Sequence, residues 1–302
     1  MGVIRRIATD VGWLPISFVN AYFLGQPGGP WVLIDTGVPG RASQIMAAAA
    51  ARFGAGKKPE AIVLTHGHFD HAGSAHVLAD EWDVPVYAHR LEFPYVSGRT
   101  KYPPKDPTVG GAIAFLSRFM PARAHPVGDR LRELPPNETL PGMPDWKWLH
   151  TPGHSPGHIS LFRASDGVLI AGDAFATMDM DSWSGLLSGK QTLARAGSPF
   201  NCDWEATKNS VQTLAKLRPN VIGAGHGIPL TDENVAQRLE NFATRFRPPR
   251  HGRYVHESAT TNENGVVSLP PAPFDPVPFA TAASLLLAGI ALGAGAFDDK
   301  NR

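Results

Sequence analysis

The segment Thr65-His66-Gly67-His68-Phe69-Asp70-His71 dominates the interpretation of this 302-residue chain. It places four potential metal ligands within six residues, directly after the apolar run Ala-Ile-Val-Leu at 61–64. That run predicts a short buried strand, so the ligands lie where a strand ends and a loop begins. The chain has 12 histidines, and chance would produce such a cluster on the order of once per thousand chains of this composition. The segment therefore predicts a metal site.

Three further segments place a potential ligand after an apolar strand. The strand expected at 146–149 leads to Thr151-Pro152-Gly153-His154, the strand at 168–171 leads to Gly172-Asp173, and the strand at 221–224 leads to Gly225-His226. Glycine beside each ligand permits tight turns and close approach of the backbone. Four strand ends that converge on one edge would form a single site.

The types of donor atom indicate a centre with two metal ions. Imidazole and carboxylate suit zinc, and also iron or manganese. Two ions about 3.5–4 Å apart can share a carboxylate and a hydroxide, and they lower the pKa of the water from which the hydroxide forms. Asp173 is the expected bridge, because a carboxylate has two oxygens whereas neutral imidazole cannot span two ions.

In the order and spacing of these motifs, the chain resembles the glyoxalase II-like hydrolases of the metallo-β-lactamase superfamily over residues 1–246. The motifs that carry the resemblance are Asp35-Thr36-Gly37, the run 66–71, Thr151-Pro152-Gly153-His154, Gly172-Asp173 and Gly225-His226-Gly227. The resemblance implies an α/β fold, a four-layer αββα sandwich with the metals at one edge of its two sheets. It implies seven metal ligands: His66, His68 and His154 for the first ion, Asp70, His71 and His226 for the second, and Asp173 as the bridge.

The resemblance also implies a function and a cofactor. The expected cofactor is two Zn²⁺ per chain, with iron or manganese as alternatives, and a bridging hydroxide would attack an ester, thioester or lactone carbonyl. Asp70 would be the catalytic residue that orients the hydroxide and carries protons, and Asp35 would hydrogen-bond a ligand loop. Two alternatives stay open: a mononuclear iron dioxygenase acting on persulfides, which would use His66, His68 and His154, and a membrane-associated relative without activity.

Absent features narrow the substrate. Lactamases with the same first motif lack a carboxylate at the position of Asp173, and the family's acyl-homoserine lactonases carry a tyrosine shortly after it, whereas this chain reads Ala-Phe-Ala-Thr at 174–177. Glyoxalase II proper has a basic, helical C-terminal region that holds glutathione, and this chain instead becomes proline-rich. A net charge of +1 indicates no nucleic-acid partner. A small-molecule substrate is expected.

Other chemically capable residues are assigned structural roles. His158 is expected to support a ligand, and His76, His89 and His150 are interpreted as non-ligands. The single cysteine, Cys202, excludes an intramolecular disulfide, and we expect a buried thiol. The residues after Asp173 are expected to line the pocket, namely Phe175, Met178, Met180 and Trp183, while Lys190 is either a substrate contact or a solvated side chain.

The chain divides into three parts by composition. Residues 1–247 are expected to form the catalytic domain, the proline-rich segment 248–278 a stiff linker, and residues 279–302 an apolar C-terminal helix or tail. The uncharged run 279–297 is about the length of a membrane helix, and three alternatives stay open for it: a membrane anchor, a helix docked on this domain or on a second subunit of a homo-oligomer, or an unstructured tail. The N-terminus predicts no secretory signal, so a cytoplasmic protein is expected, membrane-associated if the tail is an anchor.

Overall fold

The computed structural model describes residues 3–120 and 126–277. The chain divides into two compact units, Met1–Pro270 and Pro271–Arg302. The sheets, helices and candidate site described below all belong to the first unit.

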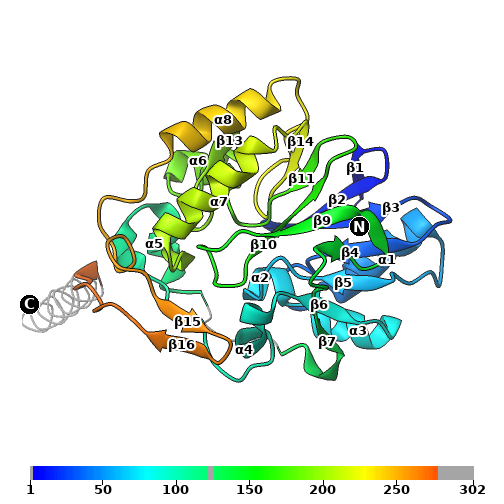
Figure 1. The fold of residues 1–302 in the computed structure, drawn as a ribbon, viewed down its shortest axis with the longest axis horizontal. Helices are drawn as coiled ribbons and strands as arrows, with labels where there is room; N and C mark the ends of the chain where they lie inside the picture. Colours follow the sequence, from blue (N-terminus) through cyan, green and yellow to red (C-terminus); the bar gives the residue numbers. More distant parts are fainter. Residues whose placement is uncertain (1–2, 121–125, 278–302) are drawn as a thin grey trace, which may run out of the picture. The chain divides into compact units, whose positions relative to one another are not determined.

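Two β-sheets form the centre of the first unit (Figure 1). The seven-stranded sheet has its strands in sequence order: β1 (Arg5–Ala8), β2 (Val11–Ile16), β3 (Val19–Gly25), β4 (Trp31–Ile34), β5 (Ala61–Val63), β6 (Val86–Ala88) and β7 (Leu131–Glu133). Pairing is antiparallel from β1 to β4 and parallel from β4 to β7. The five-stranded sheet has the order β14 (Val221–Gly223), β11 (Val168–Ile170), β10 (Ile159–Arg163), β9 (Met143–His150) and β8 (Thr139–Leu140). Only its β11–β14 pair is parallel.

Helices cover the outer face of each sheet. Helices α1 (Ala42–Phe53) and α3 (Ala75–Trp82) pack on the first sheet, and α7 (Trp204–Lys216) and α8 (Val235–Arg245) pack on the second (Figure 1). A third apolar core lies between the sheets and joins Tyr22 and Ile34 from one to Trp146 and Ile170 from the other. The expected four-layer αββα sandwich is therefore confirmed.

Local sequence explains these elements. Strands β4 and β5 are buried throughout, as their uninterrupted apolar sequences predict for strands that have covering layers on both faces. Helix α7 begins at a capping residue, Asp203, whose carboxylate accepts a hydrogen bond from the backbone N–H of Ala206 at 2.9 Å. Helix α1 ends at Gly54, whose φ of 106° an L side chain rarely adopts.

The remaining elements surround the strand ends. Strand β12 (Ala176–Met178) pairs antiparallel with β13 (Gln191–Ala194). The short helical turns are α2 (Phe69–Ala72), η1 (Arg90–Glu92), α4 (Phe93–Val96), η2 (Pro107–Val109), α5 (Ala112–Ser117), η3 (Gly128–Arg130), α6 (Trp183–Ser188) and η4 (Ser198–Phe200). The helical segment from Phe69 to Trp82 is divided into α2 and α3. Helix α5 begins only at Ala112, because the preceding Gly110 and Gly111 have positive φ.

The expectation of an extended linker from residue 248 was wrong for residues 248–270, which belong to the first unit. Strands β15 (Thr260–Asn262) and β16 (Gly265–Ser268) form a hairpin. Tyr254 is buried in the core beneath α7 and α8, and its hydroxyl donates a hydrogen bond to the carbonyl of Pro104 at 2.8 Å. The prolines are concentrated at 248–249 and 270–278, so the segment between them is free to pair and pack.

The described part of the chain contains no helix with the length and hydropathy that a membrane crossing needs. The apolar run 279–297, for which a membrane anchor was one of three expectations, lies outside the described residues. The same holds for the whole expected tail, 279–302.

Candidate metal centre

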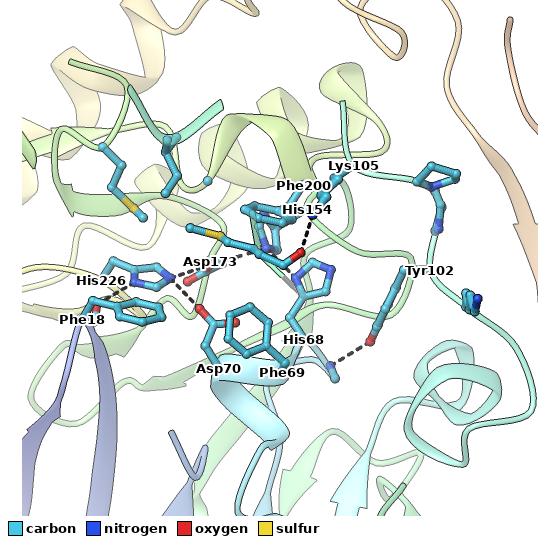
Figure 2. A pocket seen from close by; sticks show the side chains of 18 of the residues that line it. Phe18, His68, Phe69, Asp70, Tyr102, Lys105, His154, Asp173, Phe200 and His226 are labelled. Atoms are coloured by element: carbon cyan, nitrogen blue, oxygen red, sulfur yellow. Dashed lines mark hydrogen bonds and ion pairs between the residues drawn. The ribbon is translucent and has the colours of Figure 1, made fainter. Parts of the chain in front are cut away.

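The candidate ligands meet at one edge of the two sheets. They follow β5, β9, β11 and β14, as the strand-end pattern predicts. Backbone hydrogen bonds hold these loops together: Ile159 N–H donates to the Thr65 carbonyl at 2.9 Å, and Gly225 N–H donates to the Gly172 carbonyl at 2.8 Å. Figure 2 shows side chains from these loops directed toward a common space. Residues more than 150 positions apart in the chain therefore share one site.

The first group of donors consists of His66, His68 and His154. Nε2 of His66 and Nδ1 of His68 lie 3.0 Å apart, and the same His68 nitrogen lies 3.0 Å from Nε2 of His154. The shared His68 nitrogen can hydrogen-bond to only one of these two neighbours, because each nitrogen of a neutral imidazole carries either one N–H or one lone pair. The lone pairs of the three ring nitrogens converge as metal ligands do.

The second group consists of Asp70, His71 and His226. Nε2 of His226 lies 3.6 Å from the Asp70 carboxylate. The carboxylate of Asp173 lies between the two groups: its Oδ2 is 3.4 Å from Nε2 of His154 and 3.2 Å from Nε2 of His226. The structure thus brings all seven candidate ligands together, with Asp173 between the two groups.

Hydrogen bonds to the other ring nitrogens select the tautomers of three histidines. His71 Nδ1 donates to Asp35 and His226 Nδ1 donates to the Phe18 carbonyl, each at 2.8 Å. The hydroxyl of Thr65 donates to Asp35 at 2.7 Å and accepts from His66 Nδ1 at 3.1 Å. In the neutral form of each ring, the bond places the proton on Nδ1 and leaves the Nε2 lone pair directed into the site, which is the usual way a protein orients metal-binding histidines.

Asp35 and His158 have the supporting roles expected from sequence. Asp35 also accepts from the Thr65 backbone N–H at 2.8 Å, so it fixes the loop that carries His66. His158 is fully buried; its Nδ1 donates to the Thr151 carbonyl at 3.0 Å, and its Nε2 accepts from the Asp173 backbone N–H at 2.8 Å. Burial lowers the pKa of His158 to about 3, so the ring stays neutral and keeps this acceptor.

The buried charges favour a cation. Burial alone would raise the pKa of Asp173, but the neighbouring His226 and His71 hold it well below its usual range. Burial, with the neighbouring histidines, lowers the pKa of His66 and His68 well below the usual value, so both are neutral, the form that binds metal. In the described structure, His71 Nε2 and Asp173 Oδ1 are buried and lie 3.6 Å apart, and neither has a hydrogen-bond partner. Such orphaned atoms are costly in a folded protein, and a bound metal would satisfy them.

Gly225 makes the close packing of this site possible. A Cβ atom at this position would lie 2.0 Å from Oδ1 of Asp173 and 2.7 Å from Cε1 of His71. No side chain fits there without moving a candidate ligand. The glycine next to His226 is therefore required by space rather than by backbone conformation.

The family model described as the metallo-beta-lactamase superfamily matches residues 14–226. The chain belongs to this superfamily. It is 41% identical over 242 residues to the probable metallo-hydrolase YflN of Bacillus subtilis (strain 168), a match that covers 79% of this chain and 92% of that protein. It is 33% identical over 234 residues to the hydroxyacylglutathione hydrolase of Alkalilimnicola ehrlichii, covering 74% and 73%.

Solved structures of the superfamily show the same fold. Rm3 metallo-beta-lactamase aligns with a TM-score of 0.52 and 25% identity, covering 81% of this chain and 86% of that one. A beta-lactamase domain protein from Burkholderia ambifaria aligns with a TM-score of 0.54 and 22% identity, covering 80% and 75%. The chain is thus a metallo-hydrolase-type member of the metallo-beta-lactamase superfamily with a candidate His/Asp metal site.

A cavity of about 250 Å³ opens onto this superfamily site. Asp70, Asp173, His68, His154 and His226 lie at its base. Its walls are mostly apolar and come from Phe18, Phe69, Pro103, Pro104, Ile113, Met120, Met180 and Phe200, with Tyr102, Lys101 and Lys105 among them. A cavity of this kind suits a small molecule with an apolar portion.

The expected pocket residues after Asp173 are only partly in place. Met180 lines the cavity, whereas Phe175 is fully buried in the core beneath α7 and α8. Met178 packs in a small cluster beside the cavity, and Trp183 is 51% exposed. Lys190 is exposed and is not among the residues that line the cavity. Residues 100–105 form the wall instead, and they belong to an irregular, proline-rich stretch of the sequence.

The remaining expected non-ligands lie apart from the donors. His89 and His150 stack on each other with ring centroids 4.2 Å apart, and His76 is exposed beside Asp80. Cys202 is buried, and its thiol donates to the Gly153 carbonyl at 3.4 Å. Burial raises the pKa of this thiol, so it is not a nucleophile at neutral pH.

Proposed function

We propose that this chain is a dinuclear metal-dependent hydrolase of ester, thioester or lactone bonds. The observation that carries the proposal is the position of Asp173, whose carboxylate lies within 3.4 Å of Nε2 of both His154 and His226. One member of each donor group therefore lies beside the same carboxylate. A bridging carboxylate between two groups of protein ligands is the arrangement that two-metal hydrolases use.

The proposed ligands fit two divalent ions. His66, His68 and His154 would hold one, Asp70, His71 and His226 would hold the other, and Asp173 would contact both. Zinc is the expected metal, with iron or manganese as alternatives, because the donors are imidazoles and carboxylates. When bound, the ions would supply a nucleophile at neutral pH by lowering the pKa of water, and they would polarise the carbonyl of the substrate.

Asp70 is the proposed catalytic residue. Its side chain lines the cavity, and its Oδ2 lies 3.6 Å from His226 Nε2. A carboxylate at this position can accept a proton from the attacking water and return it to the leaving group. Asp70 lines the same cavity as His68, His154, Asp173 and His226 (Figure 2), so its carboxylate lies beside the space in which the substrate would bind.

The cavity supports a substrate with an apolar acyl portion. Aromatic and aliphatic side chains form most of its wall, including Phe69, Ile113 and Phe200. Burying such an acyl chain contributes about 25 cal/mol per Å² of apolar surface, while the carbonyl lies toward the donors at the base. The hydroxyacylglutathione hydrolase among the relatives supports a thioester as one candidate bond.

Metal quantification and a substrate panel test this proposal. Purified protein should carry two equivalents of metal per chain and hydrolyse at least one ester, thioester or lactone. Asp70→Asn should retain the fold but lose most turnover, and Asp145→Asn, at an exposed position, should match the parent. One equivalent of iron with consumption of oxygen would instead support the persulfide dioxygenase alternative. Unchanged turnover of Asp70→Asn would refute the role of Asp70.

A further inference from the structure

Glu92 is a fully buried carboxylate at the end of η1. Its Oε1 accepts hydrogen bonds from the Ser155 hydroxyl at 2.8 Å and the Gly157 backbone N–H at 2.7 Å. Its Oε2 accepts from the Gly67 backbone N–H at 2.9 Å and from the Tyr102 hydroxyl. Burying a carboxylate is costly unless its oxygens are paired, and here four donors satisfy them.

The partners of Glu92 belong to both loops of the first donor group. Gly67 lies between His66 and His68, and Ser155 follows His154 directly. All three candidate ligands of this group are therefore within one residue of a hydrogen bond to Glu92. The contact is close: a Cβ atom at Gly157 would lie 2.8 Å from Cγ of Glu92.

Tyr102 connects the same carboxylate to the cavity. Its ring lines the cavity, with its centroid 4.5 Å from that of His68. Its hydroxyl accepts a hydrogen bond from the Gly67 backbone N–H at 2.9 Å and donates to Glu92. Figure 2 shows the Tyr102 ring beside His68 with its hydroxyl directed to the backbone of the ligand loop. The cavity wall and the ligand loops thus share one anchor.

We propose that Glu92 is a positioning residue that sets His66, His68 and His154 in register with one another and with the Tyr102 wall of the cavity. This inference rests on the proposed function, because it takes these three histidines as ligands of the first metal. All four partners are donors, so only an ionised carboxylate can accept from all of them. An amide in its place would direct an N–H at one pair of donors and displace one of the loops.

Glu92→Gln tests this role, because the substitution preserves size. Partners that orient metal ligands typically contribute about 10–100-fold to metal affinity. One of the two zinc-binding steps should therefore weaken by about that factor. Competition with a chelator measures the affinity, and the absorption bands of the Co²⁺-loaded protein report the geometry of the ligands. One of two Co²⁺ equivalents should change its spectrum while the other does not.

Tyr102→Phe separates the wall from the ligand loops. It retains the ring and leaves Glu92 bound to Gly67, Ser155 and Gly157. Zinc affinity should stay within about threefold of the parent, while KM rises. Combined with Glu92→Gln, its effect on KM should be less than additive, because both changes break the same contact. Should Glu92→Gln not fold, Ser155→Ala removes one donor, and it should weaken zinc binding by about 3–10-fold.

Asp10→Asn is the matched control for a general loss of stability. Asp10 forms an ion pair with Arg163, at a turn away from the cavity. Its substitution should leave zinc affinity and Co²⁺ spectra unchanged. The inference would be overturned if Glu92→Gln bound zinc within about threefold of the parent, or if Asp10→Asn lost as much zinc affinity as Glu92→Gln. In either case the proposed function would still stand. A parent chain that binds no metal would refute the proposed function and this inference together.

Discussion

Replacing Gly225 with alanine tests the packing of the candidate metal centre. The new Cβ atom would lie 2.0 Å from Oδ1 of Asp173, whereas ordinary contact begins at 3.4 Å. The Asp173 carboxylate must therefore move by about 1.4 Å, the difference between these distances. The backbone at Gly225 is not in the left-handed region, so the substitution adds a steric clash without conformational strain.

The size of the effect follows from that displacement. Misplacing a reacting group by about 1 Å can cost about 100-fold in rate, which corresponds to about 2.7 kcal/mol of transition-state stabilisation. We therefore expect Gly225→Ala to reduce kcat/KM at least about 100-fold on a substrate from the panel. Zinc affinity should fall as well, because the displaced carboxylate is the proposed bridge between the two ions.

Steady-state kinetics and chelator competition measure these two effects. Gly29→Ala is the matched control, because a Cβ atom there approaches no closer than 3.6 Å to another residue; it should match the parent in both assays. If kcat/KM and zinc affinity of Gly225→Ala both stayed within about threefold of the parent, the steric argument would be refuted. The proposed position of Asp173 in the site would be refuted with it.

Two further substitutions test contacts outside the donor groups. Tyr254→Phe removes the hydrogen bond to Pro104 in the cavity wall. KM should rise severalfold while kcat stays within twofold of the parent, and the free energy of unfolding should fall by about 1 kcal/mol. A loss confined to kcat would contradict a role of Tyr254 in holding the wall. Burial would raise the pKa of Asp10, but its hydrogen bond and charge interaction with Arg163 outweigh this and lower it below 3.8. The stabilisation is therefore fully present above pH 3.8 and is lost as the pH falls through the folded-state value. In urea denaturation, Asp10→Asn should be less stable than the parent by about 1–2 kcal/mol at pH 7, and a difference that persists at pH 2 would contradict this origin.

Much of the fold could be predicted from local sequence. Helix α7 and its Asp203 cap follow from a helical pattern and a side chain that hydrogen-bonds the first turn. Strands β4, β5 and β11 follow from short apolar runs. These elements are local, because neighbouring residues determine burial pattern and capping. Helix α5 shows the limit, since two glycines with positive φ delay its start to Ala112, although the apolar pattern already begins at Val109.

The sequence by itself determined which residues are candidates for metal binding, because each of the four segments that carry them follows an apolar strand and contains glycine. That these residues bind metal stays a prediction, and the structure adds that all seven converge on one edge. Only the tertiary structure decided the supports and the cavity wall. Glu92 meets Ser155 across 63 positions, and Tyr254 meets Pro104 across 150. No local pattern marks such residues, because their roles arise from packing between elements that are distant along the chain.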